Sequence, residues 1–486
     1  MRSKISQLLT KYDNFPVQAK AGLWFLVCTV IQRSITVITT PAFTRLLSQE
    51  EYGEYGVFIS WMGILSCFVT MFIFSGLYPQ AIVKYDSRKD EFSSGMQGFT
   101  ITLVIFWCIV YYFGRNMWNG LFSLDTWEMF AMFIVMWGTA AFGFWSAEQR
   151  NEYKYKKLII VTLTEAILQP ALSIILLLNT ENKVDGLVWG IAIANLVCYF
   201  PLFIAQMKKG RKYYSGDVWK YSLKLGIPLI PHYLSSVVLS SSDRIMIQKL
   251  VGENPAGIYN LAYTISICGT MINQAVLQTI QPWMFQKIKE EKYEDIRRMA
   301  YPALIGIGCI NLMVILVAPE LIRIFAPATY LEAVWVMPPV SMSVYYMFMY
   351  NLFSNFEFYF EKPYYVSAAT FIGAGLNVLL NYIFIQLIGY VAAGYTTLAC
   401  YFAFCVAHYC FMKIVLKKEC IDTKVYSIRV IAFISLAVTG LGFLIMLTYN
   451  NIYLRYGLLI AVIAACLIKR KALIGYAMQV LGKKEV

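Results

Sequence analysis

The chain has little charge, little histidine and no catalytic signature. Only 14% of its 486 residues are charged, and only two are histidines. Neither His232 nor His408 has a carboxylate or cysteine at metal-ligand spacing, and the sequence holds no phosphate-binding loop, serine-nucleophile motif or carboxylate cluster. The connections between its apolar runs are too short for a catalytic domain. The sequence therefore predicts a protein that is not an enzyme and uses no cofactor.

The eleven cysteines do not change this prediction. Most lie inside apolar runs, where a thiol behaves as a small hydrophobic side chain. Cys400, Cys405 and Cys410 recur at every fifth residue, which spreads them around a helix instead of lining them up on one face. We therefore predict no metal site.

Apolar residues are what the chain has in abundance. They make up 59% of it, and the mean hydropathy is +0.59, both far above the values of soluble domains. A helix needs about 20 apolar residues to cross a bilayer, because backbone amides cannot stay unpaired in lipid. The sequence contains fourteen such runs and predicts an all-α polytopic membrane protein. The runs centre near residues 20–43, 56–80, 97–114, 127–147, 158–178, 186–206, 221–250, 256–280, 299–318, 334–356, 364–387, 390–412, 429–448 and 452–468.

The basic residues predict the orientation of these helices. With the N-terminus inside, 33 Lys and Arg fall on cytoplasmic segments, 7 fall on the opposite side, and Arg33 lies within the first run. Because Lys and Arg are retained in the cytoplasm during insertion, both termini are predicted to be cytoplasmic. The net charge of +13 is spread over eight short segments, so it predicts contact with anionic membrane lipids and no nucleic-acid partner.

A short repeat indicates that the bundle is duplicated. RLLSQEEYGEY at residues 45–55 returns as KLVGENPAGIY at residues 249–259, with three identical pairs, each time after a long apolar run. Six predicted helices separate the copies, so the two halves are parallel, as in transporters that bind substrate near the midplane. We place one six-helix lobe at residues 1–215, a second at 216–420, and an appended helix pair at 421–486.

Three stretches carry a family resemblance. Residues 226–263 (GIPLIPHYLSSVVLSSSDRIMIQKLVGENPAGIYNLAY) resemble the seventh and eighth helices of Wzx-type polysaccharide flippases, which belong to the MATE-like MOP superfamily. Residues 39–58 and 376–397 resemble other parts of the same family. The last stretch departs from the family pattern, which often has Pro before Gly389 and Gly-Ala-Ala where 391–394 stand.

This resemblance implies the movement of an undecaprenyl-diphosphate-linked oligosaccharide from the cytoplasmic to the outer leaflet of a bacterial inner membrane. It also implies polysaccharide polymerase or ligase machinery as partners. A multidrug extruder of the same superfamily is the first alternative, although few acidic residues lie in the runs. A flippase for a peptidoglycan lipid precursor is a close relative of the favoured reading. An integral membrane polymerase or glycosyltransferase would need a sizeable outer loop, which the sequence lacks.

Polar residues inside apolar runs are the candidate site residues, because such groups are costly in lipid. Arg33 lies about thirteen residues into the first run beside Gln32, and a guanidinium suits a diphosphate. Glu165 lies in the middle of the fifth run, five residues before Pro170. It can couple transport to H⁺ or Na⁺, or it can simply neutralise Arg33, and the sequence leaves both readings open.

The seventh run supplies the other candidates. Pro228 and Pro231 predict a kinked or broken helix, and His232 follows as a possible sugar ligand or a packed core residue. Asp243 and Arg244 are neighbours and point about 100° apart on a helix, so they are not expected to pair with each other.

We assign Asp243 to ion coupling and Arg244 to substrate binding, against the alternative of a structural role at the lobe interface. Asn377 is a further substrate-binding candidate. Asn195, Asn273, Gln278 and Asn381 share its chemistry, although bonding between helices is the commoner use of such amides.

Overall fold

The computed structural model describes residues 17–421 and 425–468, and this part of the chain is helical throughout its regular structure. Ten of the described helices are long and apolar enough to cross a membrane. The chain divides into two compact units, unit 1 at Met1–Val237 and unit 2 at Val238–Val486. The division falls inside a helix, whereas the sequence places a lobe boundary between residues 215 and 216, which stays a prediction.

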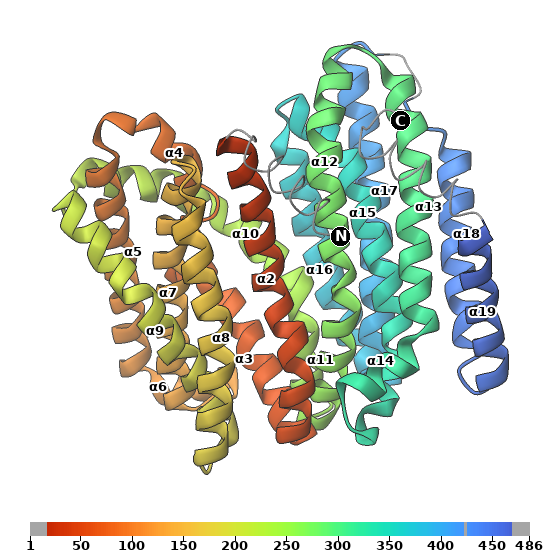
Figure 1. Ribbon diagram of the computed structural model, residues 1–486, viewed down its shortest axis with the longest axis horizontal. Coiled ribbons are helices and arrows are strands. Elements are labelled where there is room, and N and C mark those ends of the chain that lie inside the picture. The colour runs from red at the N-terminus through yellow and green to blue at the C-terminus, as the bar shows by residue number, and fades with distance from the viewer. Residues whose placement is uncertain (1–16, 422–424, 469–486) are drawn as a thin grey trace, which may run out of the picture. The chain divides into compact units, whose positions relative to one another are not determined.

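Unit 1 consists of packed helices with one 3-10 turn (Figure 1). Its elements are α2 (Val17–Leu46), α3 (Gln49–Val69), α4 (Tyr78–Lys84), η1 (Asp86–Arg88), α5 (Lys89–Phe113), α6 (Arg115–Phe122), α7 (Thr126–Asn151), α8 (Tyr155–Asn179), α9 (Lys183–Gly210) and the first part of α10 (Gly216–Leu250). Its core includes Phe58, Met132 and Phe144, which are fully buried.

Unit 2 continues from the last part of α10. Its elements are α11 (Glu253–Ile267), α12 (Gly269–Lys289), α13 (Tyr293–Leu316), α14 (Ala318–Phe325), η2 (Ala328–Trp335), α15 (Met337–Tyr359), α16 (Pro363–Ile388), α17 (Ala392–Lys418), α18 (Ile428–Met446) and α19 (Ile452–Ile468). Tyr345, Phe348 and Phe356 of α15 are fully buried and form the centre of its core.

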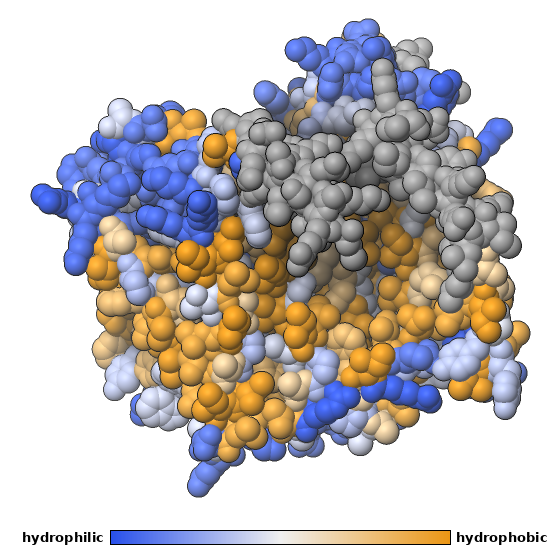
Figure 2. All heavy atoms as spheres, in the orientation of Figure 1, coloured by the Kyte–Doolittle hydropathy of each residue, from blue (hydrophilic) through white to orange (hydrophobic). Residues whose placement is uncertain are grey.

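The predicted apolar runs coincide with these helices. Each run contains most of one helix, except that run 256–280 divides into α11 and α12 and run 56–80 extends past the end of α3. Apolar side chains cover the middle of the helices of unit 1, and hydrophilic side chains gather at their ends (Figure 2). The all-helical membrane fold is therefore confirmed, whereas the count of fourteen crossings and the orientation of the termini stay predictions.

Both copies of the repeat join two helices through a two-residue turn. In the first copy α2 ends at Leu46, and Ser48 caps α3: its hydroxyl accepts from the Glu51 N–H while the Glu51 carboxylate accepts from the Ser48 N–H. In the second copy α10 ends at Leu250, and Gly252 reverses the chain with a φ of +134°, a conformation that glycine adopts without strain. The predicted structural equivalence of the two copies is confirmed.

Glycines bring the backbones of α8 and α9 together. Gly186 and Gly190 are four residues apart on one face of α9, a spacing that lets membrane helices approach closely. A methyl group on Gly190 would lie 2.3 Å from the Ser173 Cα, and one on Gly186 would lie 2.8 Å from the Leu176 carbonyl. The Ser173 hydroxyl donates to the Leu187 carbonyl at 3.3 Å across the same contact.

The prolines do not break α10. The sequence predicts a kink or a break; the helix is continuous from Gly216 to Leu250 with Pro228 and Pro231 inside it, so the break is not observed, and the kink stays a prediction. A proline removes one backbone donor and leaves one carbonyl unbonded, a loss that a helix in a bundle tolerates when other groups satisfy the freed carbonyl.

Candidate functional site

Asp243 of α10 is the centre of a buried polar cluster in unit 2. Its side chain is 1% exposed. The Tyr259 hydroxyl of α11 donates to Oδ2 at 2.7 Å, the Thr397 hydroxyl of α17 donates to Oδ2 at 2.9 Å, and the Asn381 amide of α16 donates to Oδ1 at 2.6 Å. A single carboxylate thus joins α10 to three other helices through neutral partners.

Further oxygen atoms surround this carboxylate. The Ser242 hydroxyl and the Asn381 amide both donate to the Asn377 Oδ1, at 3.0 Å and 3.2 Å, and the Thr396 hydroxyl donates to the Asn381 Oδ1. We call Asp243, Asn377, Asn381, Thr396 and Thr397, together with Tyr259 and Ser242, the Asp243 cluster.

The spacing of these residues explains why they meet. Asn377 and Asn381 are four apart and share one face of α16, and Thr396 and Thr397 lie in the first turns of α17. Tyr259 belongs to the second copy of the repeat. Its counterpart in unit 1, Tyr55, packs against Phe43 with ring centroids 6.3 Å apart. Tyr259 therefore occupies a position that both copies of the repeat share, whereas the carboxylate to which it donates comes from α10.

The donor set of the Asp243 cluster suits a hard cation. Carboxylate, amide and hydroxyl oxygens are the ligands that alkali and alkaline-earth ions prefer, whereas transition metals favour His and Cys. Within the described part of the chain, no group of three or more His, Cys, Asp or Glu could hold a metal. One carboxylate among neutral oxygens matches the charge of a proton or a sodium ion.

Arg244 points to different neighbours from Asp243. Its guanidinium carbon lies 4.3 Å from the centre of the Tyr263 ring, and one of its terminal nitrogens donates to the Ser240 carbonyl at 3.3 Å. This agrees with the prediction that the adjacent residues do not pair with each other. The buried Nε of Arg244 has no hydrogen-bond partner, and neither amide atom of Gln248, one turn further along α10, has one.

The remaining predicted residues lie in unit 1. Glu165 is buried on α8 and hydrogen-bonds with the Tyr199 hydroxyl of α9. His232 is half-buried on α10, and its Nδ1 has no hydrogen-bond partner. Gln32 is half-buried on α2, whereas the side chain of Arg33 lies outside the described part of the structure. Of the seven predicted residues, the structure places Asp243 and Asn377 in one cluster.

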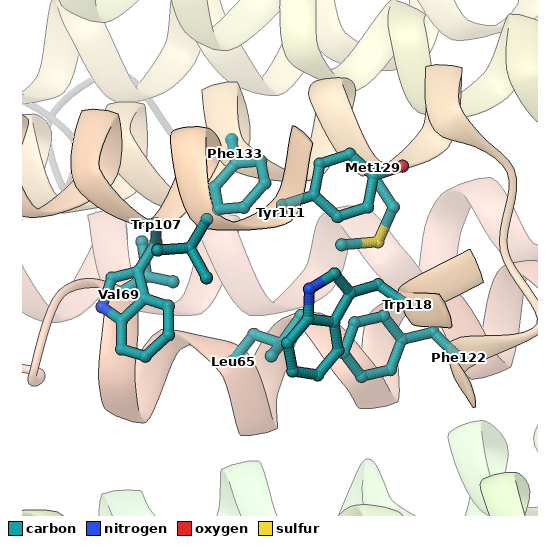
Figure 3. Close-up of a pocket in the computed structure, with 9 residues that line it drawn as sticks. Leu65, Val69, Trp107, Tyr111, Trp118, Phe122, Met129 and Phe133 are labelled. Carbon is teal, nitrogen blue, oxygen red and sulfur yellow. The ribbon is translucent and has the colours of Figure 1, made fainter. Parts of the chain in front are cut away.

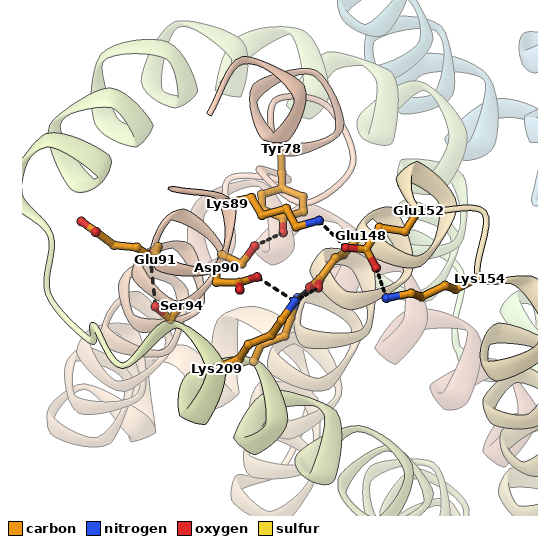
Figure 4. Close-up of polar contacts among 11 residues, drawn as sticks. Tyr78, Lys89, Asp90, Glu91, Ser94, Glu148, Glu152, Lys154 and Lys209 are labelled. Atoms are coloured by element: carbon orange, nitrogen blue, oxygen red, sulfur yellow. Dashed lines mark hydrogen bonds and ion pairs between the residues drawn. The ribbon is translucent and has the colours of Figure 1, made fainter. Parts of the chain in front are cut away.

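A polar cluster at one end of unit 1 was not predicted. Lys209 of α9 bridges Asp90 of α5 at 2.7 Å and Glu148 of α7 at 2.9 Å (Figure 4). The Gln206 amide donates to Glu148 at 2.7 Å, and the Gln97 amide donates to Gln206 at 2.8 Å. The contributing residues come from three separate helices, so no local sequence pattern points to the cluster.

Glu152 extends this cluster beyond the end of α7. It forms ion pairs with Lys89 and Lys154, as Figure 4 shows. Burial by itself would raise the pKa of Glu152, but the ammonium groups of Lys154 and Lys89 outweigh it and lower the pKa to about 2. Each acid of this cluster is therefore paired with a lysine of opposite charge, and these ion pairs hold the ends of the helices together.

Unit 1 also contains an apolar pocket of about 50 Å³ (Figure 3). It is lined by side chains from α3, α5, α6 and α7, namely Leu65, Val69, Trp107, Val110, Tyr111, Trp118, Phe122, Met129 and Phe133. The Tyr111 hydroxyl is satisfied by Asn119 at 2.7 Å. The lining is suited to hydrocarbon and not to a sugar or a phosphate.

The fold is similar to that of solved membrane transporters. The structure of the lipid II flippase MurJ in an inward closed conformation is 16% identical, covers 93% of this chain and 99% of its own, and has a TM-score of 0.66. An inward-facing multidrug resistance MATE transporter is 13% identical, covers 80% of this chain and 96% of its own, and has a TM-score of 0.63. At these identities the likeness shows the fold alone.

The chain belongs to the polysaccharide biosynthesis protein family, whose profile matches residues 19–288, more than half of its length. This is the family of Wzx-like flippases, as the three resembling stretches predicted. A protein of the Lsg locus of Haemophilus influenzae is 27% identical over 138 residues. That match spans 27% of this chain and a third, 33%, of the relative. The family and the structural neighbours are flippases and transporters, which fits the prediction of a protein without catalysis.

Proposed function

We propose that this protein moves a polyprenyl-diphosphate-linked oligosaccharide from the cytoplasmic to the outer leaflet of a bacterial inner membrane, by alternating access, for surface polysaccharide assembly. The observation that carries the proposal is membership of the polysaccharide biosynthesis family, combined with the MOP fold over nearly the whole chain. Polymerase or ligase machinery would use the product on the outer side. The proposal includes fourteen crossings with both termini in the cytoplasm.

The substrate's chemistry explains the need for a protein. A diphosphate and a set of sugar hydroxyls would lose their hydration in hydrocarbon, at a cost of several kcal/mol for each unpaired group. Arg33 and Arg244 offer cationic partners for the diphosphate, and Gln32, His232 and Asn377 offer hydrogen bonds to sugar. A guanidinium within the apolar part of the chain favours an anionic substrate.

We further propose that a monovalent cation drives the step, with Asp243 as its principal ligand. The hydrogen bonds to the buried carboxylate all come from neutral partners on α11, α16 and α17, and the guanidinium of the adjacent Arg244 lies over the Tyr263 ring, so the carboxylate oxygens can take up a small cation. Asn377, Asn381 and Thr397 would complete the oxygen shell. Glu165, with Tyr199 as its partner, is the second coupling candidate.

The experiment uses the purified full-length protein in proteoliposomes with a fluorescent polyprenyl-diphosphate oligosaccharide. Wild type should move the lipid under a sodium or pH gradient, and Arg33→Ala should abolish the movement without loss of folding. Arg298→Ala is the matched control, because that side chain is 72% exposed and forms only a surface ion pair with Glu294. Movement that is equal in both variants would remove Arg33 from the site.

A multidrug extruder of the same superfamily is the alternative function. The fold likeness to MATE transporters and the buried carboxylate of Asp243 both suit the efflux of a cationic compound. The same vesicles can be loaded with a cationic dye. Gradient-driven dye efflux without lipid movement would overturn the flippase proposal and favour the extruder.

A further inference from the structure

A second buried acid lies in unit 2, apart from the Asp243 cluster. Glu357 of α15 contacts His408 of α17, with the Oε1 and Nδ1 atoms 2.8 Å apart. Both side chains are 0% exposed. The two residues are 51 positions apart, so the sequence, in which His408 has no acidic neighbour at ligand spacing, does not reveal the pair.

Aromatic rings enclose the imidazole. Tyr350 of α15 stacks on it at 5.3 Å between ring centroids, and Phe404 of α17 meets it edge-on at 4.5 Å. The two outer polar atoms of the pair, Glu357 Oε2 and His408 Nε2, are buried without a hydrogen-bond partner. Buried polar atoms are nearly always hydrogen-bonded. Two such atoms without partners in one pair therefore indicate a site that can bind and release a proton.

The other ionisable groups near the pair are neutral at neutral pH. They are phenols and thiols, which ordinarily lose a proton only above about pH 8. Those near the pair are Tyr350, Cys405 on α17, Tyr365 of α16 behind Phe411, Tyr301 of α13 beside Tyr409, and Tyr426, which packs against Phe356.

Fixed charges lie further out. Glu361 and Lys413 are exposed, and Lys362 pairs with Glu419 at 3.6 Å. From α12, Met284 contacts Asn355 through its sulfur. The protonation of the pair is therefore decided chiefly by the pair itself.

Charge balance fixes how many protons the enclosed pair holds. We count protons beyond the one that a neutral imidazole always carries. With one such proton the pair is neutral overall, whether that proton resides on Nδ1 or on Oε1. With none it carries a net −1, and with two a net +1, and a net charge is costly to bury in hydrocarbon. A second such proton, or the loss of the first, requires that water reaches the pair.

We infer that Glu357 and His408 form a proton-binding site, which keeps one proton while enclosed and exchanges it with water when transport opens this end of α15. Glu357 is two residues from the end of α15, so the turn at residues 360–362 is the shortest route to solvent. The step makes and breaks only N–H or O–H bonds, with water as donor and acceptor. The side of the membrane with which the site exchanges its proton follows from the proposed orientation. The inference does not depend on the identity of the substrate.

Imidazole separates this site from the Asp243 cluster. The amide and hydroxyl oxygens around Asp243 are suitable ligands for a sodium ion. Around Glu357 the other neighbours are an imidazole and aromatic rings, so a hard cation would find a single carboxylate there. The pair therefore selects a proton over Na⁺. Unit 2 would hold two sites of different ion preference, one in each polar cluster.

The presence of only two histidines allows a direct test. The full-length protein, labelled with ¹⁵N-histidine and placed in lipid nanodiscs, gives ring signals from His232 and His408, and His232→Gln assigns them. We expect the His408 signals to change between pH 5 and 9. We expect Glu357→Gln to move the midpoint of that change, because the carboxylate that contacts the imidazole has been removed.

Glu361→Gln is the matched control, since Glu361 is one turn further along, exposed, and not in contact with His408. It should leave the midpoint unchanged. His408 signals that stay constant from pH 5 to 9 in the wild type would overturn the inference. So would equal midpoints in Glu357→Gln and Glu361→Gln. If Glu357→Gln does not fold, the wild-type titration alone decides.

Transport provides the second readout. In proteoliposomes, Glu357→Gln and His408→Gln should carry substrate at a rate that no longer responds to an imposed pH gradient, while a sodium gradient still acts. Rates that follow the pH gradient as in the wild type would contradict the inference. If no lipid-linked oligosaccharide moves under any condition, the proposed function fails, and the ¹⁵N titration still decides on the proton site.

Discussion

Two groups of acidic side chains, one at an end of unit 1 and one inside unit 2, are paired in opposite ways. At one end of unit 1, Lys209 contacts both Asp90 and the buried Glu148, so each of these acids has a cation next to it. In unit 2, Asp243 is surrounded by neutral hydroxyls and amides, and Glu357 by one imidazole. A carboxylate that is already paired with a lysine stabilises the packing of its helices. A carboxylate that is hydrogen-bonded only to neutral groups or to an imidazole is one that can take up an ion and release it.

The largest expected effect is at Asp243. Asp243→Asn keeps the shape of the side chain but removes its charge, so the cation would have no counter-charge in the Asp243 cluster. Transport should fall to the background of empty vesicles, while thermal unfolding in detergent remains cooperative. Retained ion-driven transport in this variant would break the distinction between the lysine-paired acids of unit 1 and the Asp243 cluster.

A change at Asn381 should affect the affinity for the driving cation more than the maximal transport rate. It bonds the Asp243 carboxylate at 2.6 Å and so orients the principal ligand. Asn381→Ala should weaken the apparent affinity for the driving cation by about 10–100-fold, the usual cost of losing an orienting partner. The measurement is initial transport rate against sodium concentration or pH. Asn351→Ala is the control, because that amide donates to the Met347 carbonyl of its own helix.

A substitution at Glu148 tests whether the ion pairs around Lys209 stabilise unit 1. Glu148→Ala leaves the Gln206 amide and Lys209 without this partner and should cost about 1–3 kcal/mol of stability. A lowered unfolding temperature in differential scanning fluorimetry measures the cost. The sodium or pH dependence of transport should keep its midpoint. A shifted midpoint would show that the polar cluster around Lys209 also takes part in ion coupling. Glu181→Ala, at an exposed position, is the control.

Gly190 tests the close packing of α8 and α9. Its added methyl group would lie 2.3 Å from the Ser173 Cα, so Gly190→Ala forces the backbones apart. Overpacking of this kind costs about 1–3 kcal/mol. Gly306→Ala on α13 is the control, since no atom lies within 4 Å of the added carbon. Equal unfolding temperatures for the two variants would refute the close contact.

The smallest effect concerns acid. The pKa of Glu152 is lowered to about 2, below the ordinary value of about 4.3. Its contribution to stability is therefore full above pH 4.3 and lost as the pH falls towards 2. The unfolding temperature of the wild type should drop more steeply than that of Glu152→Gln between pH 5 and 3. Parallel curves would mean that the pairs with Lys89 and Lys154 contribute nothing.

Much of the fold could be predicted because lipid imposes strong local rules. The apolar runs predicted the helices, and the repeat predicted the equivalent turns before α3 and α11. Asp243 and Asn377 were candidates because polar groups in apolar runs are rare. Partners of such groups come from distant helices, so Glu357 and Lys209, which contact residues 51 and 61 positions away, could not be found from local patterns.

The contact at Gly186 and Gly190 has a mechanical consequence. At Gly190 the α9 backbone lies directly on the α8 backbone at Ser173, so no α9 side chain stands between the two helices at this point to absorb a displacement. The pair is a strut. A push on Lys209 in the last turn of α9 would travel the length of that helix and carry α8 with it. Glu165 would therefore be moved by events at the far end of the bundle without any chain of polar contacts leading to it.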